Sequence, residues 1–251
     1  MLAADRGGEG ASLLVLLHGL GATRQVWRPL LADVSDHWKG RWIAPDMPGH
    51  GASPRQASYL PGAQAAAVAD LIRAEGVEGD VVLFGHSMGG TISLTLSSGY
   101  FGIMLKVTLG LGIKMAWSDE ELAGMYGQAA KPARIFAERD QAVERYLKVS
   151  GLFGLVDPQS DMAAAGVIED EGGWRMAMDP RTNEIGPPIL PGMIEGAVCP
   201  IHLAAGSNDA MCRHADLIQW DADAAALPGL THNAMVEDPA AVWAWADRFI
   251  A

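Results

Sequence analysis

Cysteine is scarce in this chain of 251 residues, which contains only Cys199 and Cys212. Two thiols do not make a disulfide framework, and neither stands in a metal-ligand spacing such as CxxC, so we expect two reduced thiols and no metal site. Cations are also scarce, because 18 Lys and Arg stand against 30 Asp and Glu and give a net charge of −12. Affinity for nucleic acid comes from Lys and Arg that displace counterions from phosphates. The balance of charge therefore argues against a nucleic-acid partner.

Long apolar runs are absent as well. No segment reaches the ~18 to 20 continuous apolar residues of a membrane span, and a negative net charge repels anionic lipid surfaces. Residues 1–12 carry Asp5, Arg6 and Glu9 among glycines and lack the basic start and apolar stretch of a signal peptide. We therefore expect no membrane partner and a cytoplasmic location. The composition, 49% hydrophobic and 19% charged, is that of an ordered globular protein.

Short apolar runs alternate with helical patterns along most of the chain. The runs are continuously apolar, which is typical of parallel strands covered on both faces, so we expect an α/β fold with a mostly parallel sheet flanked by helices. The expected strands are 12–17, 41–45, 80–84, 105–111, 201–205 and 222–227. The expected helices are 62–75, a helix that follows Ser87, and 239–250.

Strand signals vanish between residues 112 and 196, and this stretch is interpreted as helices and irregular segments. We expect a helical cap, or lid, over 112–196, inserted into a core formed by 1–111 and 197–251. Ser118 and Glu121 match a capping box, which predicts a helix start. A second cap helix is expected over 140–149, and the glycine and proline pairs that follow predict loops.

The run Gly85-His86-Ser87-Met88-Gly89 matches G-x-S-x-G and lies directly after an expected strand and before an expected helix. In that context the serine sits on a strained turn that exposes its hydroxyl, and side chains at the two glycine positions would crowd the backbone. We therefore expect Ser87 to be a nucleophile. The Met88 N–H, at the positive end of the helix dipole, is expected to bind a developing oxyanion. The alternative is a serine that merely caps a helix.

A serine hydroxyl needs a base within hydrogen-bond reach and a third group that fixes the tautomer of the base. His232 is the best base because it follows the last expected strand and precedes the C-terminal helix, and His214 is the weaker rival. Asp209 follows the strand 201–205, so its carboxylate reaches the sheet edge where ligands bind in open α/β sheets. A carboxylate that caps the next helix is the alternative for Asp209. Other candidate acids are Asp119, Asp216, Asp221 and Glu237.

A second oxyanion donor is expected in the run His18-Gly19-Leu20-Gly21, which ends the first expected strand. The backbone N–H of Leu20 is the most plausible donor. His18 is expected to hold this loop by hydrogen bonds rather than to transfer protons, and His50 in the turn 46–51 is interpreted in the same way.

Taken together, these motifs resemble the α/β-hydrolase family over nearly the whole chain. The resemblance implies an eight-stranded, mostly parallel sheet with the cap inserted after the sixth strand, although residues 1–11 leave little room for the usual first hairpin. It also places the nucleophile, acid and base on Ser87, Asp209 and His232 and the oxyanion donors on Leu20 and Met88, without a cofactor. One departure is Thr231, which stands where a glycine commonly precedes the histidine. The motifs that carry the resemblance are His18-Gly19, the turn 46–51 with Ser53, the runs 85–90 and 206–209, and His232 before Glu237-Asp238-Pro239.

The expected activity is hydrolysis of a carboxylic ester or lactone through an acyl-enzyme. Eight of the 12 methionines lie between Met104 and Met211, and flexible thioethers suit a small to medium apolar small-molecule substrate, although plain packing of the cap also explains them. Alternatives on the same fold are carbon–carbon bond hydrolysis, amide cleavage and a lyase reaction like that of SHCHC synthase in menaquinone synthesis, which the pair His232-Asn233 mildly resembles. A non-catalytic ligand receptor is a further alternative. Epoxide hydrolases and haloalkane dehalogenases are disfavoured because relatives of that kind place an aspartate where this chain has Ser87.

Overall fold

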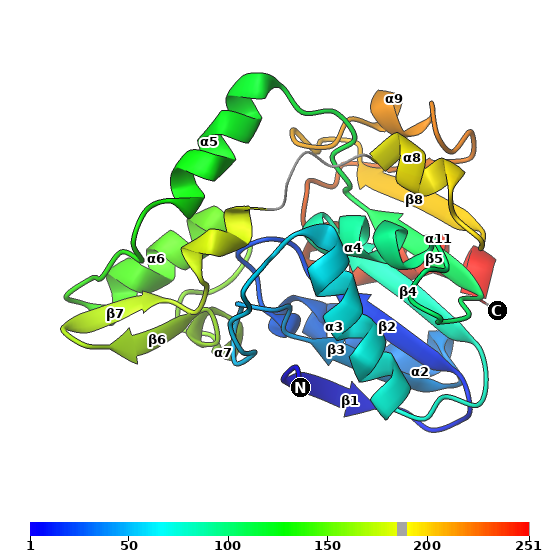
Figure 1. Ribbon diagram of the computed structural model, residues 1–251, viewed down its shortest axis with the longest axis horizontal. Coiled ribbons are helices and arrows are strands. Elements are labelled where there is room, and N and C mark those ends of the chain that lie inside the picture. Colours follow the sequence, from blue (N-terminus) through cyan, green and yellow to red (C-terminus); the bar gives the residue numbers. More distant parts are fainter. Residues whose placement is uncertain (185–189, 251) are drawn as a thin grey trace.

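One sheet of seven strands lies at the centre of the part of the chain that the computed structural model describes, residues 1–184 and 190–250. Its order is β1-β3-β2-β4-β5-β8-β9, and every pairing is parallel except that of β1 with β3 (Figure 1). The fold is therefore α/β with a mostly parallel sheet, as predicted. The strands are β1 (Ala4–Gly7), β2 (Leu13–Leu17), β3 (Arg41–Pro45), β4 (Val81–His86), β5 (Val107–Leu111), β8 (Ile201–Gly206) and β9 (Ala225–Leu227).

Helices cover both faces of this sheet, which explains why its central strands are apolar at every position. Side chains alternate between the two faces of a strand, so in β2 Leu14 packs into one buried cluster whereas Leu13 and Val15 pack into another. The covering helices are α3 (Pro61–Ala74) and α4 (Met88–Leu96) on one face and α11 (Pro239–Ile250) on the other. Shorter helices connect these elements: η1 (Arg24–Trp27), α1 (Arg28–Leu31), α2 (Val34–His37), α9 (His214–Leu217) and α10 (Ala234–Glu237).

The N-terminal strand β1 was not expected from the sequence. Its residues 4–7 read Ala-Asp-Arg-Gly and pair only with β3, so this edge strand is only partly buried and lacks an apolar pattern. Within the described residues the sheet has seven strands, so the eight strands implied by the family resemblance are wrong for this chain. The long insertion accordingly follows β5, the fifth strand of the sheet, and not the sixth.

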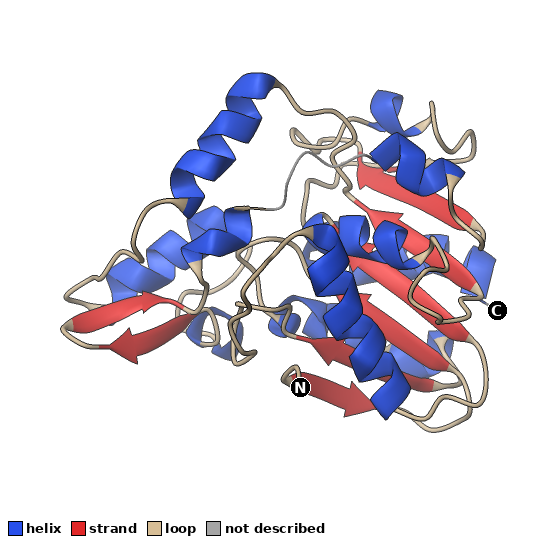
Figure 2. Cartoon of the chain, in the orientation of Figure 1, coloured by secondary structure: helices blue, strands red, loops and turns tan. Residues whose placement is uncertain are grey.

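The insertion between β5 and β8 contains helices, as expected, but also a hairpin of two strands (Figure 2). Its elements are α5 (Asp119–Ala129), α6 (Arg139–Val149), α7 (Asp161–Ala164), β6 (Val167–Asp170), β7 (Gly173–Met176), η2 (Pro180–Asn183) and α8 (Leu190–Glu195). The expectation of helices and irregular segments alone was therefore wrong. Strands of four residues are too short to show a clear alternation. Gly172, with a φ of +86°, lies in the turn between them, and Gly173, with a φ of +150°, begins β7 where a loop was expected.

The predicted start of α5 is confirmed. Ser118 Oγ accepts a hydrogen bond from the Glu121 N–H at 3.2 Å, and Glu121 Oε2 accepts one from the Ser118 N–H at 2.9 Å, which completes the capping box. The helix α6 also begins within one residue of its expected position.

The insertion lies beyond the carboxyl ends of the parallel strands, with α5, α6 and the hairpin at a distance from the sheet (Figure 1). Its last helix, α8, instead packs against α4, where Leu190 and Leu94 share a buried cluster. The division of the chain into a core and a cap at residues 112–196 stays a prediction. None of the helices in the described residues is long and apolar enough to cross a membrane.

Candidate active site

Ser87 lies on the tight turn between β4 and α4. Its φ of +51° and ψ of −117° make it the one residue other than glycine with a positive φ among those that the structure describes. Such a backbone is strained for an L-residue, and strain of this kind gathers at functional sites. The Ser87 N–H donates to the Leu111 carbonyl at the end of β5, at 2.9 Å. The half-buried serine is thus held at the carboxyl edge of the sheet.

Two glycines permit this turn. A Cβ on Gly89 would collide with the carbonyl oxygen of Leu17, and a Cβ on Gly85 would collide with that of Gly89. Neither obstacle is a flexible side chain, so neither could move aside cheaply. The prediction that side chains at these two positions would crowd the backbone is confirmed.

Asp209 and His232 are joined by a hydrogen bond at the ends of the neighbouring strands β8 and β9. The His232 Nδ1–H donates to Asp209 Oδ2 at 2.8 Å, while Asp209 Oδ1 accepts from the N–H groups of Met211 at 2.8 Å and Cys212 at 3.0 Å. Burial by itself would raise the pKa of the Asp209 carboxyl, but the bond to His232 and the two N–H donors outweigh it and hold that pKa below its usual value. Asp209 is therefore an ionised carboxylate that orients the imidazole.

The side chain of His86 links the His232 loop to the serine turn, a contact that was not expected from the sequence. Its Nε2–H donates to the backbone carbonyl of His232 at 2.9 Å, and the two rings lie 4.7 Å apart. Because His86 immediately precedes Ser87, this bond brings the histidine loop against the turn. The only sequence signal for it was the place of His86 inside the G-x-S-x-G run.

The residues on either side of His232 hold it in place. Before it, the N–H and hydroxyl of Thr231 both donate to the Glu237 carboxylate. After it, the buried Asn233 donates from Nδ2 to the carbonyl of Ser150, at the end of α6 in the insertion, at 3.0 Å. Thr231 stands where a glycine commonly precedes the histidine, and here it has a structural role because it binds Glu237. Asn233 ties the histidine loop to the insertion.

Leu20 and Met88 lie close to the serine turn. A Cβ on Gly19, the residue before Leu20, would stand only 3.1 Å from Ser87 Cβ. The Met88 N–H is the first of α4 and so has no acceptor within the helix. The side chains of Leu20 and Met88 pack in the same apolar cluster. The Met88 N–H is therefore available next to the serine, and Leu20 follows the glycine that approaches the serine.

Two buried histidines fix the loop that contains Leu20. The Nδ1–H of His18 donates to the Gly19 carbonyl at 2.8 Å, and its Nε2 accepts from the Met47 N–H at 2.9 Å. His50 accepts from the Gly21 N–H at 3.1 Å and donates to the Pro48 carbonyl at 3.1 Å. Burial lowers the pKa of His18 to about 4, and burial together with the nearby His18 lowers the pKa of His50 to about 3. The expected loop-holding role of both histidines is what these hydrogen bonds provide.

Neutral buried histidines predict a loss of stability in mild acid. The pKa of His86 is also lowered to about 3, by burial first and then by His232. Each of the three histidines binds a proton near pH 6.5 when unfolded but only near pH 3 to 4 when folded, so its contribution is complete above pH 6.5 and is lost as the pH falls toward 4. The free energy of unfolding should decrease by up to about 1.4 kcal/mol per pH unit for each. Urea titrations at pH 7.5, 6 and 5 measure this slope.

The matched variant for this prediction is His50→Gln, because glutamine keeps one donor and one acceptor but does not titrate. Its slope between pH 6 and 5 should be shallower than that of the wild type by about one histidine's share. An unchanged slope would mean that other groups cause the acid sensitivity.

The rival candidates lie in other structural roles. The His214 Nε2–H donates to the Ala224 carbonyl at 2.8 Å, Asp216 forms an ion pair with Arg213, and Asp221 accepts from the Leu203 N–H at 2.7 Å. Glu237 is engaged by Thr231, and Asp119 stands in the first turn of α5. Residues 1–184 and 190–250 contain no cluster of three or more His, Cys, Asp or Glu side chains that could hold a metal ion.

The sequence was compared with models of known protein families. The model of the alpha/beta hydrolase family matches residues 14–245, which is most of the sequence. The chain belongs to this family. The family resemblance drawn from the sequence motifs is thereby confirmed.

Among its relatives, this α/β-hydrolase is 30% identical over 224 residues to the magnesium-chelatase 30 kDa subunit of Rhodobacter capsulatus, covering 82% of this chain and 73% of the relative. It is 33% identical over 86 residues to the pimeloyl-[acyl-carrier protein] methyl ester esterase of Proteus mirabilis. That match covers 34% of this chain and 31% of the relative, so it spans about a third of the esterase. The crystal structure of E-2-(acetamidomethylene)succinate hydrolase matches with a TM-score of 0.82 at 23% identity, covering 99% of this chain and 94% of that chain. At such identity the likeness concerns the fold.

Proposed function

We propose that this chain is a serine hydrolase that cleaves a carboxylic ester or lactone through an acyl-enzyme. The observation that carries the proposal is the hydrogen-bonded pair of Asp209 and His232, whose loop is bonded through His86 to the strained turn of Ser87. Nucleophile, base and orienting acid in this relation are the components of a catalytic triad, whatever their order in the chain.

In the proposed reaction, Ser87 Oγ attacks the ester carbonyl carbon while His232 Nε2 takes the hydroxyl proton. The carbonyl oxygen becomes an oxyanion, which accepts hydrogen bonds from the N–H groups of Leu20 and Met88. When the tetrahedral intermediate collapses, the bond to the alcohol oxygen breaks and His232 gives its proton to that oxygen. Water, deprotonated by His232, then attacks the acyl-enzyme and releases the acid and the free serine.

The negative charge of Asp209 stabilises the imidazolium that forms at each step, and its lowered pKa keeps it ionised. His232 is well placed for proton transfer because its side chain is 16% exposed while that of Asp209 is fully buried. A substrate can therefore reach the imidazole, whereas the carboxylate is shielded.

Ester hydrolysis is favoured over the other reactions of this fold because one relative is named a methyl ester esterase. The lyase alternative rested on the pair His232-Asn233, and the Asn233 amide is engaged by the Ser150 carbonyl, which gives it a structural explanation. A small to medium apolar substrate and a cytoplasmic location stay predictions.

A covalent phosphonate probe tests the proposal, because a 4-nitrophenyl alkylphosphonate traps an activated serine without requiring the natural substrate. We expect one equivalent of nitrophenol to be released and one adduct to form, located on Ser87 by peptide mass spectrometry. Ser98, at the end of the same helix region, is the internal comparison and should stay unlabelled. An absence of adduct, or an adduct on another residue, would contradict the assignment, and an absence would favour a non-catalytic receptor.

A further inference from the structure

A cavity of about 430 Å³ lies within the insertion, between the segment after α5, the helix α6, the strand β7 and η2. Four of its 13 lining residues are cations and none is a carboxylate. This composition is the reverse of the chain as a whole, in which 30 acidic residues outnumber 18 Lys and Arg. The four cations are Lys131, Arg134, Arg145 and Arg175.

Three of these cations have no anionic partner among the residues that the structure describes. Arg175 pairs with Asp170 and donates to the Met176 carbonyl. Within the described part of the chain, by contrast, Lys131, Arg134 and Arg145 form no ion pair. Like charges gathered around one concavity repel each other and create a local positive potential. An anion bound between them would relieve that repulsion.

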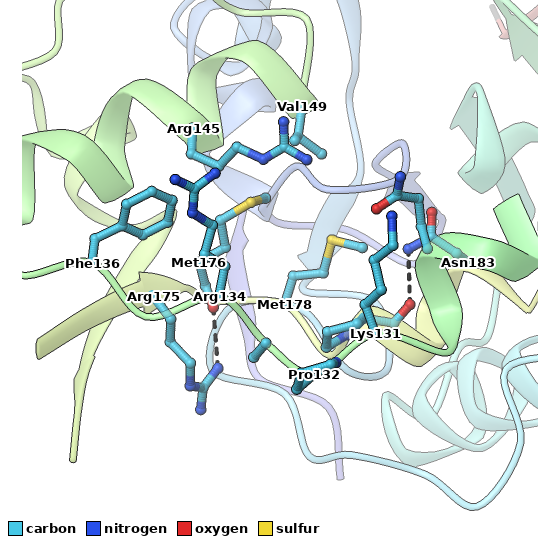
Figure 3. A pocket seen from close by; sticks show the side chains of 13 residues that line it. Lys131, Pro132, Arg134, Phe136, Arg145, Val149, Arg175, Met176, Met178 and Asn183 are labelled. Atoms are coloured by element: carbon cyan, nitrogen blue, oxygen red, sulfur yellow. Dashed lines mark hydrogen bonds between the residues drawn. The ribbon is translucent and has the colours of Figure 1, made fainter. Parts of the chain in front are cut away.

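The walls of the cavity suit an organic anion better than a simple ion. The Arg134 guanidinium lies 4.7 Å from the centre of the Phe136 ring, which orients it along the wall. In Figure 3, the thioethers of Met176 and Met178 lie between Arg145 at the top and Arg175 at the bottom. Flexible thioethers adapt to the shape of an apolar chain. The cavity thus combines apolar side chains with cations, three of which are exposed.

The cavity also adjoins the loop of Leu20. Val149, which lines the cavity, lies so close to this loop that a Cβ on Gly21 would stand 2.8 Å from its Cγ1. Met178 forms a β-bridge with His50, whose ring accepts the Gly21 N–H. Arg145 precedes Val149 by four residues of α6, on the same face and ~6 Å away along the helix. An acyl group of several carbon atoms that extends from the loop of Leu20 into the insertion would therefore come within reach of Arg145.

We infer that this cavity binds a carboxylate or phosphate group at the far end of the acyl part of the substrate. The inference rests on the proposed ester hydrolysis at Ser87 and specifies its substrate class: an ester whose acyl chain ends in an anion, in place of the wholly apolar substrate that the methionines predict. The guanidinium groups of Arg134 and Arg145 supply planar arrays of donors for such a group, and Lys131 supplies a further charge.

Two matched esters test the inference. The ratio of kcat/KM for mono-4-nitrophenyl adipate to that for 4-nitrophenyl hexanoate should exceed one in the wild type, and it should fall about tenfold to hundredfold in Arg145→Gln, the cost of removing a charged hydrogen-bond partner. An ester of the same length with a terminal phosphonate distinguishes the two anions, since the preferred group shows the higher ratio. High salt should reduce the ratio, because it screens exposed charges.

The matched control is Lys148→Gln, which removes a cation from the same helix that is paired with Glu144 and does not line the cavity. It should leave the ratio unchanged. A ratio of one or less for both anionic esters in the wild type, or an equal ratio in the wild type and Arg145→Gln, would overturn the inference.

A binding measurement separates this inference from the proposed function. Calorimetric titration of adipate and of inorganic phosphate into the wild type requires no turnover. Binding of either that is lost in Arg145→Gln supports the anion site even if no ester is cleaved, in which case the hydrolase proposal alone fails. Hydrolysis of the neutral ester without binding of either anion would overturn the anion site and leave the hydrolase proposal standing.

Discussion

Replacement of Ser87 by alanine should lower kcat toward 4-nitrophenyl esters by about 10⁶-fold, and His232→Ala should cost about as much. The double variant should be no slower than either single one. The reason is that the serine is a nucleophile only while the histidine accepts its proton, so the loss of either residue removes the whole function of the pair. Steady-state rates of the three variants, measured above background hydrolysis, check this non-additivity.

Controls for this prediction come from chemically matched residues with structural roles. Ser98→Ala and His214→Ala should each retain kcat within about tenfold, because Ser98 only bonds the Thr95 carbonyl and His214 the Ala224 carbonyl. All variants should show cooperative thermal unfolding. The assignment would be refuted if the double variant were slowed by the product of the two single effects, or if Ser87→Ala turned over at a near-normal rate.

Asp209→Asn should lower kcat by about 10⁴-fold. The structure gives a specific reason, because Asp209 Oδ1 already accepts from the N–H groups of Met211 and Cys212. An asparagine must keep its oxygen on that side, so its NH₂ group faces His232 Nδ1. The imidazole then carries its proton on Nε2 and cannot accept one from Ser87. Rates at pH 8, together with the melting temperature, measure the effect.

The comparison variant is Asp216→Asn. It removes a carboxylate that lies further along the chain than Asp209 and pairs with Arg213. It should change kcat by less than tenfold. If Asp209→Asn kept activity within tenfold of the wild type, Asp209 would not be the acid that orients the base.

Much of the fold followed from local pattern. All six strands expected from the sequence are present, although the last begins at Ala225 rather than at residue 222, and α11 spans its expected range. Buried parallel strands are continuously apolar, which is a strong signal. The strands that were missed carry weak signals. Each of β1, β6 and β7 is only four residues long, and the edge strand β1 is in addition half polar.

The candidate site divides in the same way. The placement of Ser87, Asp209 and His232 could be predicted because each follows a strand, and parallel strands bring their carboxyl ends to one edge of the sheet. The partners that hold these residues could not be predicted. His86 meets the carbonyl of His232 across 146 positions of sequence, and Asn233 meets that of Ser150 across 83. No local pattern encodes a side chain that bonds a distant backbone carbonyl.

The sequence by itself determined the α/β fold, the serine turn and the order in which Ser87, Asp209 and His232 follow their strands, since these depend on hydrophobic runs, glycines and strand ends. Only the tertiary structure decided how the histidine loop is fixed and where the cations of the insertion gather. In the sequence, no motif or spacing marks Lys131, Arg134 and Arg145 as a group. They converge because α6 and the segment before it fold around one cavity, and such convergence depends on packing between elements rather than on the pattern within any one of them.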